Sequence, residues 1–229
     1  MVRYEARGGA VTASGALKLD AHAVLWSASE SDRAGKPLLV MMHGYGSHEG
    51  DLFGLSPYLP LNTVVASLRA PIPEGGGYAW FPRESAVGAN PAGRPHPEIV
   101  DAAALAVLNW LDAQPAAPAV GLLGFSQGAA MALQLLRHAP GRFACAVQLS
   151  GFVASGAAPG DAELAQLRPP VFWGRGTDDD VIPADAIART ADWLPAHANA
   201  DTRIYEGLAH AVSQQELTDV AAFLGTHLN

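Results

Sequence analysis

Ala119-Val-Gly-Leu-Leu-Gly124-Phe-Ser-Gln-Gly128-Ala-Ala-Met131 is the stretch that decides the fold. It passes from an apolar run typical of a buried strand to a run of small residues typical of a helix packed on a sheet. Glycine lies two positions before and two positions after Ser126, and only small residues fit around such a sharp turn. The turn also brings Ser126 to the N-terminus of a helix, where backbone N–H groups favour negative charge. The alternative is a structural glycine-rich turn, but the context favours Ser126 as a nucleophile.

On both sides of this turn, short apolar runs alternate with longer helical patterns. This order is expected of an α/β fold with a mostly parallel sheet and helices on both faces. In the first predicted helix, Ile99, Ala102, Leu105, Leu108 and Leu111 recur at helical spacing and are expected to face the core. Including the stretch quoted above, the patterns predict strands at 23–26, 37–42, 63–67, 119–124, 144–149, 170–173 and 202–205, and helices at 98–113, 127–138, 184–193 and 214–228.

Two local patterns stand out beyond these periodic segments. Ser213 and Glu216 form a capping-box pattern at the start of the last helix, in which each side chain accepts the other residue's backbone N–H. Residues 70–97 are rich in proline and glycine and have no helical period, and such a long excursion is more often functional than idle. Within it, Gly75-Gly-Gly77 lacks the Lys-Ser/Thr of a phosphate loop, so it indicates flexibility.

Length and composition restrict the number of domains, the partners and the cellular location that we expect. The 229 residues, 49% of them hydrophobic, suit a single domain over 1–229. The net charge of −8 comes without any cluster of basic residues, so we expect no nucleic-acid partner. The single Cys145 lies in a predicted strand and is expected to be a packing residue. The opening residues lack a signal peptide's apolar run and no run reaches 18 apolar residues, so we expect a cytoplasmic protein without integral membrane association. A homodimer is compatible with the sequence.

A serine nucleophile needs a histidine base. The histidines downstream of Ser126 are His138, His197, His210 and His227. His210 follows the strand predicted at 202–205 and precedes the last helix, which places it on a loop at the carboxyl end of a strand, where sites of open α/β sheets lie. We predict His210 as the base, the alternative being that it merely caps the helix.

The acid that orients the base is expected between Ser126 and His210, on the loop after the strand at 170–173. Asp178, Asp179 and Asp180 stand there in succession, and spacing alone does not choose among them. One is expected to turn inward to His210 while the others stay solvated or cap the next helix. The loop after the strand predicted at 37–42 has a rival interpretation, in which His43 and His48 bind a metal ion. Their spacing and the lack of a carboxylate cluster disfavour this interpretation, so we expect no metal.

With these residues in view, the chain resembles the carboxylesterase, phospholipase and acyl-protein thioesterase family of α/β-hydrolases over nearly its whole length. The resemblance implies an α/β-hydrolase fold without a large cap domain. It also implies Asp179 as the acid, four residues before Pro183, although many members have proline where this chain has Asp180. The matching segments are 42–46, 78–81, 124–131, 149–151, 176–183 and 210–217.

The resemblance assigns further roles around the nucleophile. The backbone N–H groups of Tyr45 and Gln127 form the implied oxyanion hole, and losing one such donor typically costs about 100- to 1000-fold in rate. The pocket walls are the least determined part of the site. Each candidate wall residue could equally belong to a small hydrophobic cluster beside the main core. The implied substrate-binding residues are Leu52, Phe53, Trp80, Phe81, Phe152 and Val153.

Taken together, these features predict a cofactor-independent serine carboxylesterase acting on small-molecule esters through an acyl-enzyme intermediate. Without a large cap the site is expected to be open, which favours broad, short-acyl specificity, with residues 70–97 as the main candidate for covering it. One alternative keeps the triad but takes thioesters or lysophospholipids, as relatives do. Another is a non-catalytic ligand-binding protein on a hydrolase scaffold.

Overall fold

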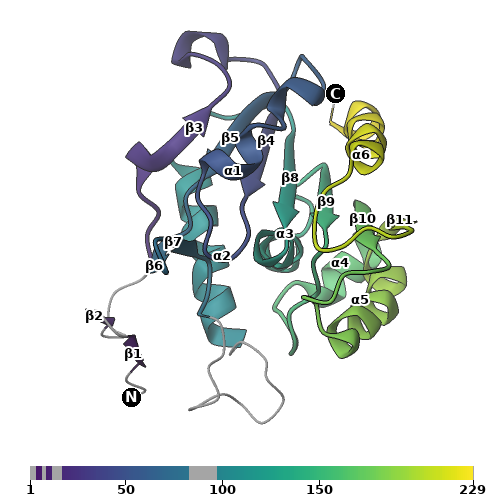
Figure 1. Ribbon diagram of the computed structural model, residues 1–229. Helices are drawn as coiled ribbons and strands as arrows, with labels where there is room; N and C mark the ends of the chain where they lie inside the picture. Colours follow the sequence, from purple (N-terminus) through teal and green to yellow (C-terminus); the bar gives the residue numbers. More distant parts are fainter. Residues whose placement is uncertain (1–3, 7–8, 12–16, 83–96, 229) are drawn as a thin grey trace.

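The computed structural model describes residues 4–6, 9–11, 17–82 and 97–228. Its centre is a seven-stranded sheet in the order β11-β10-β9-β8-β4-β5-β3. Every neighbouring pair is parallel except β3 with β5. The predicted α/β class is confirmed, and the carboxyl ends of the parallel strands meet at one edge of the sheet (Figure 1).

The predicted strands and helices lie close to their expected positions. The sheet strands are β3 (Val24–Trp26), β4 (Leu38–Met42), β5 (Val64–Leu68), β8 (Val120–Phe125), β9 (Cys145–Leu149), β10 (Pro170–Gly176) and β11 (Asn199–Tyr205). The helices are α1 (Gly50–Phe53), α2 (Pro97–Asp112), α3 (Gln127–His138), α4 (Asp161–Leu167), α5 (Ala184–His197) and α6 (Gln214–His227). Two hairpins add β1 (Tyr4–Ala6) with β2 (Gly9–Val11), and β6 (Ile72–Glu74) with β7 (Gly77–Ala79).

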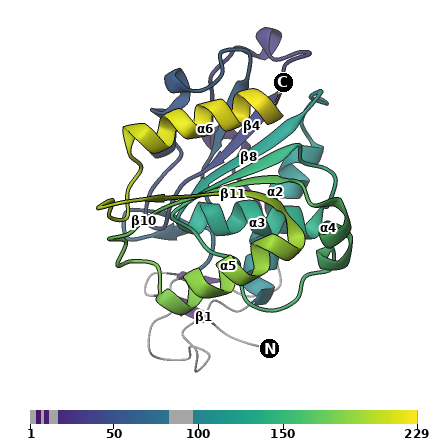
Figure 2. The same cartoon turned by 90° about the vertical axis from the view of Figure 1, so that its right-hand side faces the viewer.

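Helices cover both faces of the sheet and bury one apolar core on each. Figure 2 shows α6 on one side of the strands and α2, α3 and α5 on the other. Central strands such as Leu38–Met42 and Cys145–Leu149 are buried at every position, as expected for strands covered on both faces. Odd and even residues of one strand therefore serve different cores: Leu39 packs with the α6 side and Val40 with the α2 and α3 side.

The predicted core-facing positions of α2 are confirmed in part, since Leu108 and Leu111 are buried and Ile99 packs against the core. The helix buries Val100, Ala103, Ala104 and Val107, whereas the side chain of Leu105 is 48% exposed. The sequence of α2 carries two overlapping apolar stripes one residue apart, and periodicity alone does not choose between them. Packing against α3 and the sheet buries residues of both stripes, with the small alanines allowing close approach, and leaves Leu105 outside the contact.

The excursion at 70–97 begins with structure that the sequence did not predict. Gly75 and Gly76 have φ of 58° and 91° and form the turn between β6 and β7. Gly77 lies against the 44–47 loop so closely that a Cβ there would be 2.1 Å from the Gly46 carbonyl oxygen. These glycines therefore serve a tight turn and a close backbone contact. The remainder of the excursion, 83–96, lies outside the described residues, and with it most of the predicted cover.

The capping box at α6 forms only in part. The Ser213 hydroxyl accepts the Glu216 N–H at 3.0 Å, as predicted. The Glu216 carboxyl is fully buried, and within the described chain neither oxygen meets hydrogen-bond geometry with a partner. Burial is the largest cause that raises the pKa of Glu216, to about 7. The Ser213 backbone N–H lowers this pKa, and the Asp219 carboxylate raises it further.

None of the helices in the described ranges is long and apolar enough to cross a membrane.

Candidate active site

Ser126 lies on the turn between β8 and α3 in a backbone conformation that L-residues rarely adopt, with φ 55° and ψ −114°. The flanking glycines allow this turn. A Cβ on Gly124 would lie 2.1 Å from the Gly128 carbonyl oxygen, and one on Gly128 would lie 1.9 Å from the Met42 carbonyl oxygen. The Ser126 N–H donates to the Leu149 carbonyl at 2.9 Å, which fastens the turn to β9. The local chain therefore presents Ser126 half-exposed at the carboxyl edge of the sheet.

His210 and Asp179 meet beside this turn. The Nδ1 atom of His210 lies 2.8 Å from Asp179 Oδ2, and the side chains are 16% and 2% exposed. The ring of His210 packs on Phe125, the residue before Ser126, with centroids 4.8 Å apart. Parallel pairing of β8, β9 and β10 brings the turn and the acid loop to one edge, and β11 delivers His210 next to them.

The three candidate acids have different environments. Burial alone would raise the pKa of Asp179, but hydrogen bonds from His210, Ile182 and Val181 outweigh it and hold that pKa below its ordinary value. Asp178 accepts the hydroxyl of the neighbouring Thr177 at 2.9 Å instead. Asp180 is exposed. Asp179 is thus the ionised carboxylate facing His210.

The other downstream histidines have local contacts of their own. His138 Nε2 lies 2.7 Å from Asp101 Oδ1, between α3 and α2. His197 stacks on Trp193 with ring centroids 4.3 Å apart, and His227 packs on Phe223. None of these partners belongs to the acid loop, which leaves His210 as the histidine at the site.

The two residues of the implied oxyanion hole come from adjacent strands. Gln127 begins α3, and Tyr45 lies two residues past His43, after the end of β4. A Cβ on Gly44 would lie 3.5 Å from the Ser126 Cβ, so the Gly44 backbone runs directly beside Ser126. The 44–47 loop is held from its other side by β7, through Gly46 N–H to the Tyr78 carbonyl at 2.9 Å and Tyr78 N–H to the Ser47 carbonyl at 2.8 Å. The loop that carries Tyr45 is therefore held by Ser126 on one side and by β7 on the other.

The predicted wall residues divide by burial. Trp80 is fully buried, and Leu52, Phe81 and Val153 are nearly so, each within a hydrophobic core. Phe53 and Phe152 are half-buried at the core surface. Among the six, these two phenylalanines retain side-chain surface for a substrate.

Helix α5 holds the backbone beside Phe152. The Val153 N–H donates to Thr190 Oγ1 at 2.9 Å, and Arg189 Nε donates to the Val153 carbonyl at 3.1 Å. Farther along the same loop, the buried Arg137 donates to the carbonyls of Ala154 and Gly156 and to the Asp161 carboxylate. The loop after β9 is therefore a fixed wall.

The rival metal interpretation has little support from His43 and His48. His43 is fully buried, its Nδ1 lies 2.7 Å from the Gly44 carbonyl oxygen, and its Nε2 accepts the Ala70 N–H at 3.1 Å. His48 Nδ1 accepts the Gly50 N–H. Burial lowers the pKa of His43, so the ring is neutral. Across the described ranges no group of three or more His, Cys, Asp or Glu is arranged to hold a metal ion.

Cys145 is fully buried in β9, and burial raises the pKa of its thiol to about 12. The thiolate is the nucleophilic form of cysteine, so this side chain packs rather than reacts.

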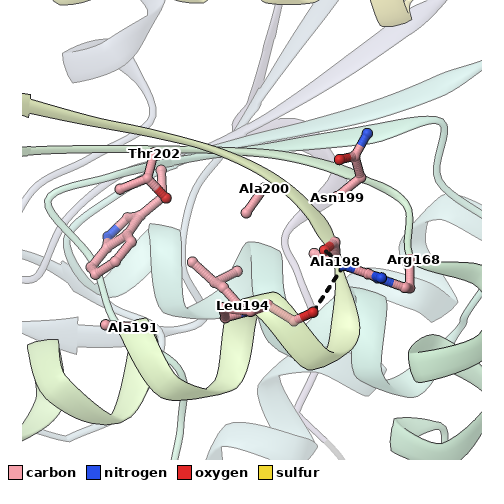
Figure 3. Close-up of a pocket in the computed structure, with 9 residues that line it drawn as sticks. Arg168, Ala191, Leu194, Ala198, Asn199, Ala200 and Thr202 are labelled. Carbon is pink, nitrogen blue, oxygen red and sulfur yellow. Dashed lines mark hydrogen bonds between the residues drawn. The ribbon is translucent and has the colours of Figure 1, made fainter.

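A cavity of about 330 Å³ lies away from these residues, between α5 and the first half of β11 (Figure 3). Leu194, Ala198 and Thr202 line it, and Arg168 closes one end by donating to the carbonyls of Pro195 and Ala198. Its lining contains no residue of the predicted site.

Sequence reasoning missed the side chain of Gln127, for which only a backbone role is implied. Its Oε1 accepts the Trp80 N–H at 2.8 Å and its Nε2 donates to the Phe81 carbonyl at 2.6 Å. Its partners lie far away in the sequence, so the only available signal was a long polar residue at the start of an otherwise small-residue, buried helix.

The fold and the Ser126 turn define an α/β-hydrolase. Residues 27–228 match the family model described as Phospholipase/Carboxylesterase, and the chain belongs to that family. The predicted resemblance is confirmed.

Individual relatives carry related names. The chain is 34% identical over 115 residues to acyl-protein thioesterase 1 of Eremothecium gossypii, a match covering 46% of each protein. It is 28% identical over 196 residues to esterase YpfH of Escherichia coli, covering 81% of each. The crystal structure of acyl-protein thioesterase 2 from Zea mays superposes with a TM-score of 0.73 at 26% identity, covering 90% of this chain and 99% of that one. The first of these alignments thus spans about half the length of the curated relative.

Proposed function

We propose that this protein is a serine carboxylesterase that hydrolyses short-chain carboxylic esters with Ser126, His210 and Asp179. The observation that carries the proposal is the 2.8 Å contact between His210 Nδ1 and Asp179 Oδ2 beside the strained Ser126 turn. A buried, ionised carboxylate on one ring nitrogen leaves the other nitrogen to act as the base toward Ser126. The family membership and the esterase names of its relatives support the same chemistry.

In this proposal the reaction proceeds through an acyl-enzyme. His210 Nε2 takes the Ser126 hydroxyl proton as Ser126 Oγ attacks the ester carbonyl carbon, and Asp179 stabilises the imidazolium. The backbone N–H groups of Tyr45 and Gln127 donate to the oxyanion of the tetrahedral intermediate. His210 returns the proton to the leaving alcohol. The same nitrogen then deprotonates a water molecule whose oxygen attacks the acyl carbon; the bond from that carbon to Ser126 Oγ breaks, His210 returns the proton to Oγ, and the carboxylic acid is released.

Hydrolysis of p-nitrophenyl acetate by Ser126→Ala tests the proposal. We expect kcat to fall by at least about 1000-fold, because the nucleophile is removed. Ser150→Ala is the matched control: Ser150 is the other serine of the described chain with positive φ (45°), is buried at the end of β9, and has no proposed role. Unchanged turnover in Ser126→Ala would refute the assignment.

A second candidate function is hydrolysis of acyl thioesters or lysophospholipids by the same triad. Similarity to two proteins named acyl-protein thioesterase favours it. Matched oxygen esters and thioesters of two to sixteen acyl carbons separate the candidates. The first proposal expects kcat/KM to be highest for short oxygen esters, whereas a preference for long acyl chains or for thioesters supports the second.

The non-catalytic alternative makes a distinct prediction for Ser126. A reactive serine forms a covalent adduct with a fluorophosphonate, which mass spectrometry of the intact protein and its peptides detects. We expect one adduct, on Ser126, and none in Ser126→Ala. Folded protein without any adduct would support a ligand-binding role instead.

The proposal includes the setting in which the enzyme works. The acidic composition and absence of a basic cluster favour a cytoplasmic enzyme acting on small dissolved esters. Fractionation of cells producing the tagged protein checks the location, and recovery in the membrane pellet would contradict it.

A further inference from the structure

The side chain of Gln127 spans from the nucleophile helix to the segment after β7. Gln127 is 5% exposed, and its amide is used on both sides, as acceptor from the Trp80 N–H and as donor to the Phe81 carbonyl. Both bonds are shielded from water, where a hydrogen bond is stronger and its loss more costly. The same residue supplies a backbone N–H of the proposed oxyanion hole, so fixing its side chain also fixes the start of α3.

Trp80 continues this connection to the end of β4. Its indole is fully buried, and Nε1 donates to the His43 carbonyl at 2.9 Å. The rings of Trp80 and His43 also contact, with centroids 5.7 Å apart. His43 is held in turn by the Ala70 N–H, which donates to Nε2. His43 is thus fixed at both its carbonyl and its ring, two residues before Tyr45.

The two halves of the proposed oxyanion hole are therefore joined by one buried hydrogen-bond network, in which the Gln127 amide bonds to the backbone of Trp80 and Phe81 and the Trp80 indole bonds to the His43 carbonyl. We propose that the Gln127 amide and the Trp80 indole are positioning groups that hold the backbone N–H of Gln127 and the backbone N–H of Tyr45 at the separation that an oxyanion requires. This inference rests on the proposed function and extends it to residues that do not touch the reacting atoms.

The chemistry explains why such a network would be needed. Oxyanion donors act only when both lie about 2.7–3.1 Å from the developing charge, and a displacement of about 1 Å can cost roughly 100-fold in rate. The donors follow different strands, Tyr45 after β4 and Gln127 after β8, so neither strand fixes both. Backbone contact between Gly128 and Met42 sets how close the strand ends lie, while the network sets the orientation of the peptides that follow them.

A purely structural role for the same residues predicts a different outcome. Loss of core packing lowers stability, whereas misplaced oxyanion donors lower transition-state binding without weakening the ground state. The positioning role therefore lowers kcat with little change in KM, and weakens binding of a tetrahedral analogue by a similar factor.

The experiment uses Trp80→Phe and Gln127→Met, each in the full chain. Trp80→Phe removes the indole donor and keeps an aromatic ring, and Gln127→Met keeps the side-chain length without its amide. The readouts are kcat and KM for p-nitrophenyl acetate and inhibition by a short-chain trifluoromethyl ketone, whose hemiketal with a serine carries an oxyanion. We expect kcat and ketone affinity each to fall about 10- to 100-fold while KM stays nearly constant.

Matched controls separate packing from positioning. Trp173→Phe changes a buried tryptophan whose Nε1 has no hydrogen-bond partner among the described residues, and Gln134→Met changes a buried glutamine of α3 that donates to Asp101. Thermal unfolding of all four variants checks that each is folded at the assay temperature. If Trp80→Phe does not fold, Gln127→Met carries the test, because its side chain remains similar in length.

The double variant adds an internal check, since changes within one network are not additive. We expect Trp80→Phe/Gln127→Met to lose less kcat than the product of the single losses. Single variants that behave like the controls would overturn the positioning role. Ser126→Ala keeps the two proposals apart: if it is inactive while Trp80→Phe and Gln127→Met match the controls, only the network inference fails.

Discussion

Ser126 holds a conformation that its own side chain disfavours, and the surrounding contacts maintain it. Its N–H is bonded to Leu149, and its carbonyl accepts the N–H groups of Ala129 and Ala130. Positive φ in a non-glycine residue stores about 1–3 kcal/mol that the fold must supply. The strained turn leaves Ser126 half-exposed between β8 and α3.

A comparison of Ser126→Gly with Ser126→Ala measures this strain. Both variants lack the hydroxyl, but only glycine adopts φ 55° without a Cβ conflict. We expect Ser126→Gly to have a free energy of unfolding about 1 kcal/mol above that of Ser126→Ala, as measured by urea denaturation. Equal stabilities would show that the turn is unstrained. Neither variant should hydrolyse p-nitrophenyl acetate.

The three successive aspartates allow a second test at single residues. Asp179→Asn keeps the shape of the side chain but favours the wrong His210 tautomer, so we expect kcat to fall by about 100- to 10,000-fold. Asp178→Asn and Asp180→Asn are built-in controls with adjacent carboxylates, and we expect small effects on kcat. A larger loss in either control would move the acid role away from Asp179.

Among the elements, α6 is unusual because it buries a carboxyl group at its first turn. Glu216 lies over Gly174 of β10, where a Cβ would be 2.1 Å from its Oε1. The missing side chain at Gly174 thus makes room for the carboxyl. The helix that follows His210 is seated on the sheet through this contact, next to the apolar side chains of Phe172 and Leu217.

The raised pKa of Glu216 makes stability depend on pH. Its folded pKa of about 7 lies above the ordinary value of 4.5, so between these values the folded protein keeps a proton that the unfolded chain has lost. Stability therefore falls as pH rises from about 4.5 to 7, then levels.

Glu216→Gln removes this dependence. The difference in free energy of unfolding, variant minus parent, is expected to be about 2–3 kcal/mol larger at pH 8 than at pH 5. Urea titrations at these two pH values provide the measurement. Glu163→Gln, at an exposed position of α4, is the control and should give no such gain. A gain that does not change with pH would contradict the buried, proton-binding role.

At the scale of the whole molecule, two cores share one sheet. The apolar core on the α2 and α3 face and the core on the α6 face are built from alternate residues of the same strands. Separating the strands exposes both cores together, which is the physical basis for cooperative unfolding.

We therefore expect residues 1–229 to unfold in one transition, in keeping with the predicted single domain. Calorimetry checks this through equal calorimetric and van't Hoff enthalpies, and coincident loss of tryptophan fluorescence and far-ultraviolet circular dichroism is the independent measure. Trp26 and Trp173 lie toward opposite edges of the sheet, so two separable fluorescence changes would indicate two units.

Local sequence patterns were sufficient for the strands of the central sheet, for the four predicted helices and for the sharp turn at Ser126. Apolar runs, helical spacing and the two glycines around Ser126 act over a few residues, and the predicted strands and the Ser126 turn lie where those patterns indicate. His210 was predicted for a similar reason, because a loop at the carboxyl end of a parallel strand faces the site. Asp179 needed the family resemblance, since three equal neighbours differ only in where their side chains point.

The sequence by itself thus determined the order of the sheet strands and the main helices, the α/β class and the sharp turn at Ser126, because these depend on short-range sterics and hydrophobic periodicity. Only the tertiary structure decided that Leu105 of α2 is exposed, which aspartate faces His210, and that Gln127 reaches Trp80 across the molecule. Each of these outcomes depends on contacts between residues far apart in the chain. Packing against a specific neighbour, and the burial of polar atoms that must find partners, selects among alternatives that local patterns leave equal.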